Sequence, residues 1–212
     1  MIIGNTHKKC INHFHNSLDF NLDILNKVVQ SKKLRANELI SIYELTFLQM
    51  FISFEGYLES SFMCYLMGKK SIYKYSPKIR IKPKSKKDAI NIIHGKPISN
   101  TEYIEWSNIK SVAEKSKVLW GKEETPYTKL LSSAPHYKHM KNLRNAIAHL
   151  SLFHNDSMEI ITRQYLTTNR KTSPGKLLKA QYSHNGNSKE LIFFFKDQLN
   201  HYADIVQLNP NK

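Results

Sequence analysis

The stretch ANELISIYELTFLQMFISFEGYLESSFMCYLM, residues 36–67, decides the fold of this chain. No proline interrupts it, and its apolar residues lie on nearly every side of a helix instead of along one stripe. Asn37 offers a cap at its start, and Gly68 follows at a position where helices prefer to end. Because such a helix must be covered on most sides, we expect it to be central in a bundle or buried again at a subunit contact.

Helical patterns also precede and follow this segment. Apolar residues recur at intervals of three and four over 11–29 and 191–208, which predicts a first and a last helix. Shorter helices are expected at 88–94, 104–120 and 127–131. The chain is therefore predicted to be mostly helical.

Strand signals are confined to short segments. Alternation favours strands at 158–167 and 177–183, which could pair as a hairpin, and at 78–82, KIRIK. The predicted fold class is mainly α: a helical bundle with a long central helix, a basic inserted lobe and a short C-terminal β-hairpin. We expect a single domain over residues 1–212, with a variable basic insertion at about 69–124.

The charge is strongly positive and concentrated. The formal net charge is +15, and residues 69–87 contain nine Lys or Arg and no acidic residue. A chain this basic is expected to bind a polyanion, and the interleaved Tyr73 and Tyr75 favour RNA because aromatic rings stack on unpaired bases. The alternative interpretation is a solubilising loop. The predicted RNA-binding residues are Lys78, Arg80, Lys82, Lys84, Lys86, Lys87 and Lys141.

The sequence predicts neither a secreted nor a membrane protein. The segment MIIGNTHKKC has no apolar core of a signal peptide, and the most apolar window, 45–67, contains Glu55 and Glu59. The lysines gather in a proline-bracketed segment and not on one face of an amphipathic helix, which disfavours a membrane-surface protein. Cys10 and Cys64 are expected to be free thiols of a reducing compartment, so we predict a cytoplasmic protein.

A second stretch, APHYKHMKNLRNAIAHL at 134–150, carries the candidate chemistry. Its apolar residues follow helical spacing, and Pro135 falls where a first helical turn tolerates proline. Asn145 and His149 are four residues apart, so on a helix they share a face. Arg144 precedes them and is long enough to reach the same groove. A cation, an amide and an imidazole on one patch can act on a phosphate.

These three side chains fit metal-free cleavage of RNA. An imidazole gives and takes protons near neutral pH, a guanidinium holds phosphate through its fork of donors, and RNA supplies its own nucleophile, the 2′-hydroxyl. No metal or cofactor is expected. His136 and His139 could share a helix face, but no HExxH motif, Cys-x-x-Cys pair or carboxylate cluster accompanies them. A phosphate-binding glycine-rich loop is also lacking.

Glu55 has two interpretations. It lies one helical turn before Glu59 within the apolar surface of the 36–67 segment. The two residues could form an acidic stripe that faces solvent. Alternatively, Glu55 is a supporting residue that orients a basic side chain of the motif helix.

Residues 143–149, LRNAIAH, resemble the signature of HEPN domains (higher eukaryotes and prokaryotes nucleotide-binding). That signature is Arg followed directly by a polar residue, with His placed so that four to six residues separate it from the Arg. The FEGYLESSF segment at 54–62, the TPYTKLL segment before the motif helix, and the C-terminal strands and helix resemble the RiboL-PSP-HEPN branch of the superfamily. The resemblance covers most of the chain and is specific at residues 143–149.

The resemblance implies a metal-independent endoribonuclease of a toxin–antitoxin, phage-defence or RNA-processing system. It implies Arg144 and His149 as catalytic residues and Asn145 as the supporting polar residue. The partners it implies are RNA, a second copy of the chain, and an antitoxin or defence-system protein. The alternative is a non-catalytic RNA-binding or partner-binding HEPN module.

The chemistry also favours two copies of the motif. In-line attack by the 2′-hydroxyl needs groups on both sides of the phosphorus, whereas each chain offers one guanidinium and one imidazole in the motif. A two-fold axis near the motif helix would bring the same patch of a second subunit opposite the first. We therefore expect a homodimer with a composite site made of Arg144, Asn145 and His149 from both chains.

Overall fold

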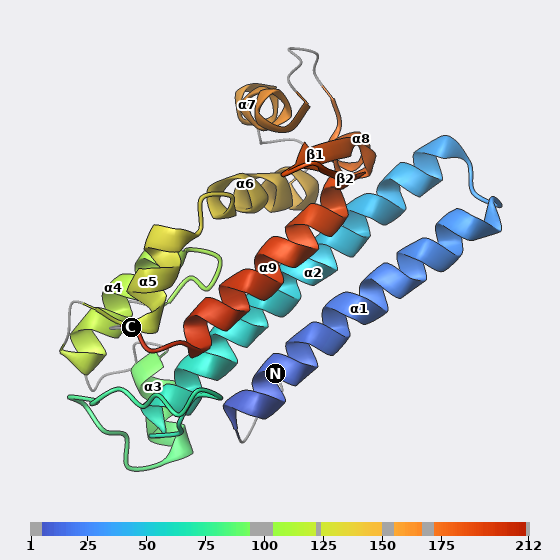
Figure 1. The fold of residues 1–212 in the computed structure, drawn as a ribbon. Coiled ribbons are helices and arrows are strands. Elements are labelled where there is room, and N and C mark those ends of the chain that lie inside the picture. Colours follow the sequence, from blue (N-terminus) through green and yellow to red (C-terminus); the bar gives the residue numbers. More distant parts are fainter. Residues whose placement is uncertain (1–5, 94–103, 122–123, 150–154, 167–171, 211–212) are drawn as a thin grey trace. The chain divides into compact units, whose positions relative to one another are not determined.

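The computed structural model describes residues 6–93, 104–121, 124–149, 155–166 and 172–210 (Figure 1). These residues are mainly helical and include one short antiparallel hairpin near the C-terminus, which confirms the predicted fold class. The elements of the described residues are, in chain order, α1 (His7–Ser31), α2 (Ala36–Leu66), α3 (Lys86–Ile93), α4 (Ile109–Trp120), α5 (Pro126–Ser133), α6 (Tyr137–Ala148), α7 (Asn155–Leu166), α8 (Pro174–Lys179), β1 (Gln181–His184), β2 (Asn187–Glu190) and α9 (Leu191–Gln207).

The chain divides into two compact units. Unit 1 comprises Met1–His15, Phe54–Pro135 and His201–Lys212, and unit 2 comprises Asn16–Ser53 and His136–Asn200. The long helices α1, α2 and α9 contribute residues to both units. The motif helix α6 belongs to unit 2, whereas the basic segment belongs to unit 1. The single domain with an insertion at 69–124 stays a prediction.

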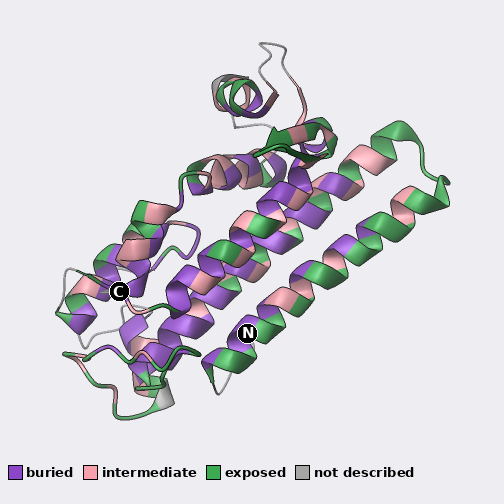
Figure 2. Ribbon diagram, in the orientation of Figure 1, coloured by how far each residue is buried: buried purple, intermediate pink, exposed green. Residues whose placement is uncertain are grey.

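Helix α2 has the length and the burial that its sequence predicts. Buried residues follow one another along most of the helix (Figure 2). Leu45 and Ile52 are large apolar residues of α2 that stay exposed, at 54% and 42% of their surface. Because most of its other large apolar residues are buried within this same chain, α2 is the central helix that the sequence predicts.

The two ends of α2 are stabilised by different capping interactions. The N–H of Arg35 donates to the Glu38 carboxylate at 2.7 Å, so Glu38 closes the first turn. The prediction that Asn37 caps the helix was wrong, because the helix has already begun at Ala36. At the other end Gly68 adopts the left-handed conformation, with φ +70, and the Lys69 N–H donates to the Cys64 carbonyl at 2.9 Å. The predicted stop at Gly68 is therefore confirmed.

In unit 1, polar atoms of buried aromatic residues join α2 to α5 and α9. The hydroxyl of Tyr57 donates to the Ala203 carbonyl at 2.8 Å, and that of Tyr65 donates to the Val206 carbonyl at 2.7 Å. Tyr127 of α5 shares a hydrogen bond of 2.9 Å with the Ser61 hydroxyl. These bonds satisfy hydroxyls that burial would otherwise leave without water.

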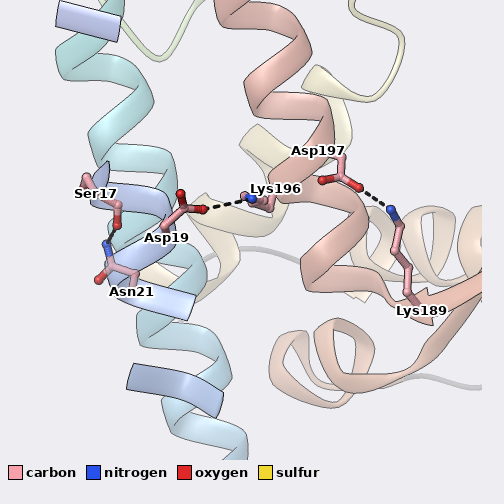
Figure 3. A network of polar contacts seen from close by, with 6 residues as sticks. All are labelled: Ser17, Asp19, Asn21, Lys189, Lys196 and Asp197. Carbon is pink, nitrogen blue, oxygen red and sulfur yellow. Dashed lines mark hydrogen bonds and ion pairs between the residues drawn. The ribbon is translucent and has the colours of Figure 1, made fainter. Parts of the chain in front are cut away.

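In unit 2, α2 holds the C-terminal elements through two adjacent residues. The Tyr43 hydroxyl donates to the Glu190 carboxylate at 2.7 Å, and the Glu44 carboxylate accepts the Gly175 N–H at 2.9 Å. Ion pairs extend the connections at the surface (Figure 3). Lys196 of α9 pairs with Asp19 of α1 at 3.0 Å, and Lys189 of β2 pairs with Asp197 of α9.

The strand predicted at 158–167 is wrong, because residues 155–166 form α7. Ile161 and Tyr165 are four residues apart and both buried, while Ile160 is 61% exposed. This spacing places the buried residues on one helical face, as in an amphipathic helix. Glu159 and Arg163 add an ion pair of 2.8 Å across one helical turn.

The hairpin is formed by later residues than predicted. The segment 177–183 does not pair with 158–167; instead β1 pairs with β2 in antiparallel register. Asn185 and Gly186 link the strands and both have positive φ, at 50 and 79. Asn-Gly is the dipeptide that favours such a two-residue turn. The last helix, predicted over 191–208, begins at Leu191 and forms α9.

Two other predictions for unit 1 differ from the structure. KIRIK at 78–82 is not a strand. Its one backbone hydrogen bond to another segment in the described residues runs from the Arg80 N–H to the Leu119 carbonyl, at 3.0 Å. The helix expected from 104 begins at Ile109, because the Asn108 side chain caps it by accepting the Ser111 N–H. Its predicted end at Gly121 is confirmed.

We predict that Gly175→Ala disrupts unit 2. A Cβ at Gly175 would lie 2.4 Å from the Ile40 carbonyl oxygen and 3.0 Å from the Glu44 side chain, so backbone would have to move. The unfolding free energy should fall by about 2 kcal/mol or more. Gly56→Ala is the control, since its Cβ meets nothing within 4 Å and should stabilise α2 by about 0.5–1 kcal/mol. Chemical denaturation measures both; equal effects of the two variants would contradict the close packing of α8 on α2.

His7 is buried in unit 1, and its pKa is strongly lowered. Its side chain is 1% exposed, its Nδ1 lies 3.3 Å from Gln207 Nε2, and its ring packs on Tyr65 with centroids 4.1 Å apart. Burial lowers the pKa of His7 from 6.5 to about 4, and a hydrogen bond with the Lys69 backbone partly opposes this shift. The folded chain therefore resists protonation of His7 until about pH 4.

The second prediction follows from this difference in proton binding. Between pH 6.5 and about 4 the unfolded chain binds a proton at His7 that the folded chain does not, so stability falls as pH falls through that window. The loss attributable to His7 should approach about 3 kcal/mol. Denaturation at several pH values should show a shallower decline for His7→Gln than for wild type, whereas His13→Gln, at an exposed position of α1, should match wild type. Identical pH profiles for His7→Gln and wild type would contradict a buried neutral His7.

Candidate active site

The motif helix α6 begins later than its sequence indicates. Ala134 is the C-cap of α5, Pro135 and His136 form a turn, and α6 starts at Tyr137. The prediction of Pro135 in a first helical turn was wrong. The predicted apolar face is confirmed over Tyr137, Met140, Leu143 and Ile147, which are all buried, and α6 packs against α7 and α8 in unit 2. Leu150 lies outside the described residues.

Arg144 and Asn145 are in direct contact on the last turns of α6. The Nη1 of Arg144 donates to the Oδ1 of Asn145 at 3.1 Å, and both residues are half-buried. Because a guanidinium only donates, the amide oxygen must face Arg144. The Nδ2 of Asn145 then points away from Arg144 with two N–H donors. The pair thus presents donors of two residues to an incoming anion.

His149 lies just past the end of the helix and not within it. It is the C-cap residue, with φ −126 and ψ 62, and its side chain is exposed. The backbone N–H of His149 donates to the Asn145 carbonyl at 3.0 Å, which fixes its backbone beside the motif. The shared face of Asn145 and His149 stays a prediction for this C-cap side chain.

Lys141 extends the motif by one turn. It is half-buried on α6, four residues before Asn145 and three before Arg144, so it shares their face of the helix. Of the predicted RNA-binding residues it is the one that the structure places on the motif helix. Unit 2 thus brings together Lys141, Arg144 and Asn145, with His149 at the end of the same helix.

The other predicted site residues belong to unit 1. Lys78, Arg80, Lys82, Lys84 and Lys87 are exposed, and the side chain of Lys86 lies outside the described residues. Glu55 is half-buried on α2. The supporting role of Glu55 stays a prediction.

Two histidines at the start of α6 share one tyrosine hydroxyl of α7. The Nδ1 atoms of His136 and His139 lie 2.8 and 3.3 Å from the Tyr165 hydroxyl. One hydroxyl has one proton, so one imidazole accepts it and the other donates its own N–H. Burial lowers the pKa of both histidines; the charges of His139 and His184 add to the shift of His136.

This His–Tyr–His cluster was not predicted from the sequence. The spacing of His136 and His139 indicates a shared helix face but not which side chain of another element they contact. Tyr165 could not be added because its segment was predicted to be a strand. In the residues that the structure describes, no group of three His, Cys, Asp or Glu is placed to hold a metal ion. The cluster instead fixes α6 against α7 and so positions the helix that carries Arg144.

No protein-family model, curated protein or solved structure matches this chain. The resemblance to HEPN domains therefore stays a prediction that rests on residues 143–149. In the described part of the chain, no helix combines the length and the apolar character needed to cross a membrane.

Proposed function

We propose that this protein is a metal-independent endoribonuclease of the HEPN type that acts as a toxin or phage-defence effector. The observation that carries the proposal is the contact of 3.1 Å between Arg144 and Asn145, with the exposed imidazole of His149 at the end of the same helix. The set holds a cation, amide donors and an imidazole that can transfer a proton.

Each residue has a role in attack by the RNA 2′-hydroxyl on the adjacent phosphorus. Arg144 binds the non-bridging phosphate oxygens and stabilises the charge that develops on them in the transition state. Asn145 holds the Arg144 guanidinium through Oδ1 and donates from Nδ2 to the phosphate. His149 transfers the proton, either from the 2′-hydroxyl or to the departing 5′-oxygen. The products are a 2′,3′-cyclic phosphate and a 5′-hydroxyl end.

Charge supports RNA as the substrate. The net charge of +15 favours a polyanion, and exposed Lys and Arg side chains line the basic segment of unit 1. A non-catalytic RNA-binding or partner-binding module shares these charges. The contact between Arg144 and Asn145 favours catalysis, because a module that only binds RNA has no need of a guanidinium held by an amide on a helix that ends at an exposed imidazole.

The third prediction concerns the catalytic residues. His149→Ala should lower RNA cleavage by about 10²–10⁴-fold, because a general acid–base is lost. Arg144→Ala should lower it to a similar extent, because the developing charge loses its partner. Cleavage of a labelled RNA by purified wild-type protein should continue in EDTA.

Matched variants separate catalysis from folding. His13→Ala and Arg163→Ala replace exposed residues of the same types on α1 and α7, and they should retain wild-type cleavage. Circular dichroism of His149→Ala should equal that of wild type, since His149 is exposed and outside the helix. Full activity in both motif variants would overturn the assignment, and RNA binding without any cleavage by wild type would favour the non-catalytic module.

The fourth prediction concerns assembly. One motif offers one imidazole and one guanidinium, so a second copy would supply the groups on the opposite side of the phosphorus. Light scattering should give the mass of a dimer. When His149→Ala chains are exchanged with wild-type chains in equal amounts, a composite site that needs both imidazoles should retain about a quarter of the activity. Independent sites would retain half, and a fully active monomer would contradict the dimer outright.

A further inference from the structure

The basic segment 69–87 is a fixed part of unit 1 and not a loose loop. The Ser71 N–H donates to the Tyr75 carbonyl at 2.8 Å, which closes a turn. The Ile72 N–H donates to Gln207 of α9 at 3.4 Å, and the Arg80 N–H donates to the Leu119 carbonyl of α4 at 3.0 Å. A segment that served only to add charge would not need to be tied to two helices.

The far end of this segment is held by a reciprocal cap. The Asp88 carboxylate accepts the Lys84 N–H at 2.7 Å, and the Ser85 hydroxyl accepts the Asp88 N–H at 3.1 Å. These bonds start α3 and fix the chain that follows Lys82. The nearest acidic side chain in the sequence is thereby bonded to backbone. The lysines between the two anchors are not neutralised by a residue of their own segment.

Two surface hollows meet at Ser76 in this segment. The larger, of about 710 Å³, is lined by apolar Met67, Pro77 and Pro83 and by Lys78 and Lys82. The smaller, of about 500 Å³, is lined by Tyr73, Lys74, Leu208 and Asn209. Ser76 borders both hollows. Both volumes fall within the range of sites for small organic groups.

The two tyrosines of the segment have different environments. Tyr73 is 57% exposed and faces the smaller hollow. Tyr75 is half-buried, its ring meets Tyr65 edge to face with centroids 6.0 Å apart, and burial raises its pKa. Tyr73 is thus available for stacking on a ligand, whereas Tyr75 is part of the packing that fixes the segment.

We propose that the two hollows seat successive unpaired nucleotides of single-stranded RNA. One base stacks on the Tyr73 ring, and the next lies on the apolar floor between Met67 and Pro83. Lys78 and Lys82 bind the phosphates at the rim. An apolar surface flanked by cations suits a nucleotide, because the base packs on the surface and the phosphate binds the cations. An exposed aromatic ring can stack only on a base that is not paired. The choice of RNA over another single strand rests on the proposed function, while the site itself does not.

Binding is tested in the His149→Ala background, which keeps the RNA intact. The probe is a fluorescently labelled RNA octamer, either single-stranded or annealed to its complement, and anisotropy gives the affinity. Lys78→Gln with Lys82→Gln should weaken binding of the single strand about 20-fold at 0.1 M salt and lower the salt slope by about 1.4, the value for two phosphate contacts. Lys8→Gln with Lys9→Gln removes the same charge from exposed positions on α1 and should leave both quantities near wild type.

Tyr73 provides the test of stacking. Tyr73→Ala should weaken binding of the single strand about tenfold with no change in salt slope, and Tyr73→Phe should retain binding because it keeps the ring. Binding of the duplex should not respond to Tyr73→Ala. Inorganic polyphosphate of matched charge should compete poorly, since it has no bases.

Each opposite result overturns the site. Equal losses from the two lysine pairs would show attraction by net charge alone, and equal losses on duplex and single strand would show that no unpaired base is seated. Binding to phosphatidylserine vesicles in place of RNA, with the same dependence on Lys78 and Lys82, would identify a lipid surface instead. If wild type binds as described but cleaves nothing, the nucleotide site stands and the nuclease proposal fails.

Discussion

The rest of the structure depends on the burial of the apolar side chains of α2 against the other helices. This helix is apolar on most sides, so each unit must supply side chains that bury its part of it. In unit 1 the buried hydroxyls of Tyr57 and Tyr65 tie α2 to α9. In unit 2 the Phe51 ring packs on Tyr137, the first residue of α6, with centroids 5.5 Å apart. The motif helix is therefore positioned by the same burial that determines the fold.

The sequence correctly predicted those parts of the fold in which one local sequence pattern favours a single structure. The long apolar run of α2, the glycine stops at Gly68 and Gly121, and the course of α9 depend on local preferences that tertiary contacts reinforce. The strand predicted at 158–167 failed because its alternating residues also satisfy helical spacing at Ile161 and Tyr165, and burial on one face favours the helix. The Asn185-Gly186 pair carries the dipeptide that favours a two-residue turn, and it joins β1 to β2.

The candidate site could be predicted from sequence only in part. The sequence predicted that Arg144 reaches the groove of Asn145, and in the structure the two side chains are joined by a hydrogen bond of 3.1 Å. The place of His149 was not predictable from periodicity, because it depends on where α6 ends. The contact of Tyr165 with His136 and His139 joins residues of two helices, and no spacing along the chain encodes such a contact. Its effect on the motif is indirect: it fixes the beginning of the helix whose end carries Arg144.

The central claim is that the RNA 2′-hydroxyl is the nucleophile and that the protein supplies only a cation, amide donors and a proton-transfer group. The most direct measurement uses an RNA that is cut at a mapped linkage and a copy in which the nucleotide 5′ to that linkage is a 2′-deoxynucleotide. The account predicts that the single substitution abolishes cleavage at that linkage while other linkages are still cut in EDTA. Undiminished cleavage at the deoxy linkage would show that water or another external nucleophile attacks, and it would contradict the account.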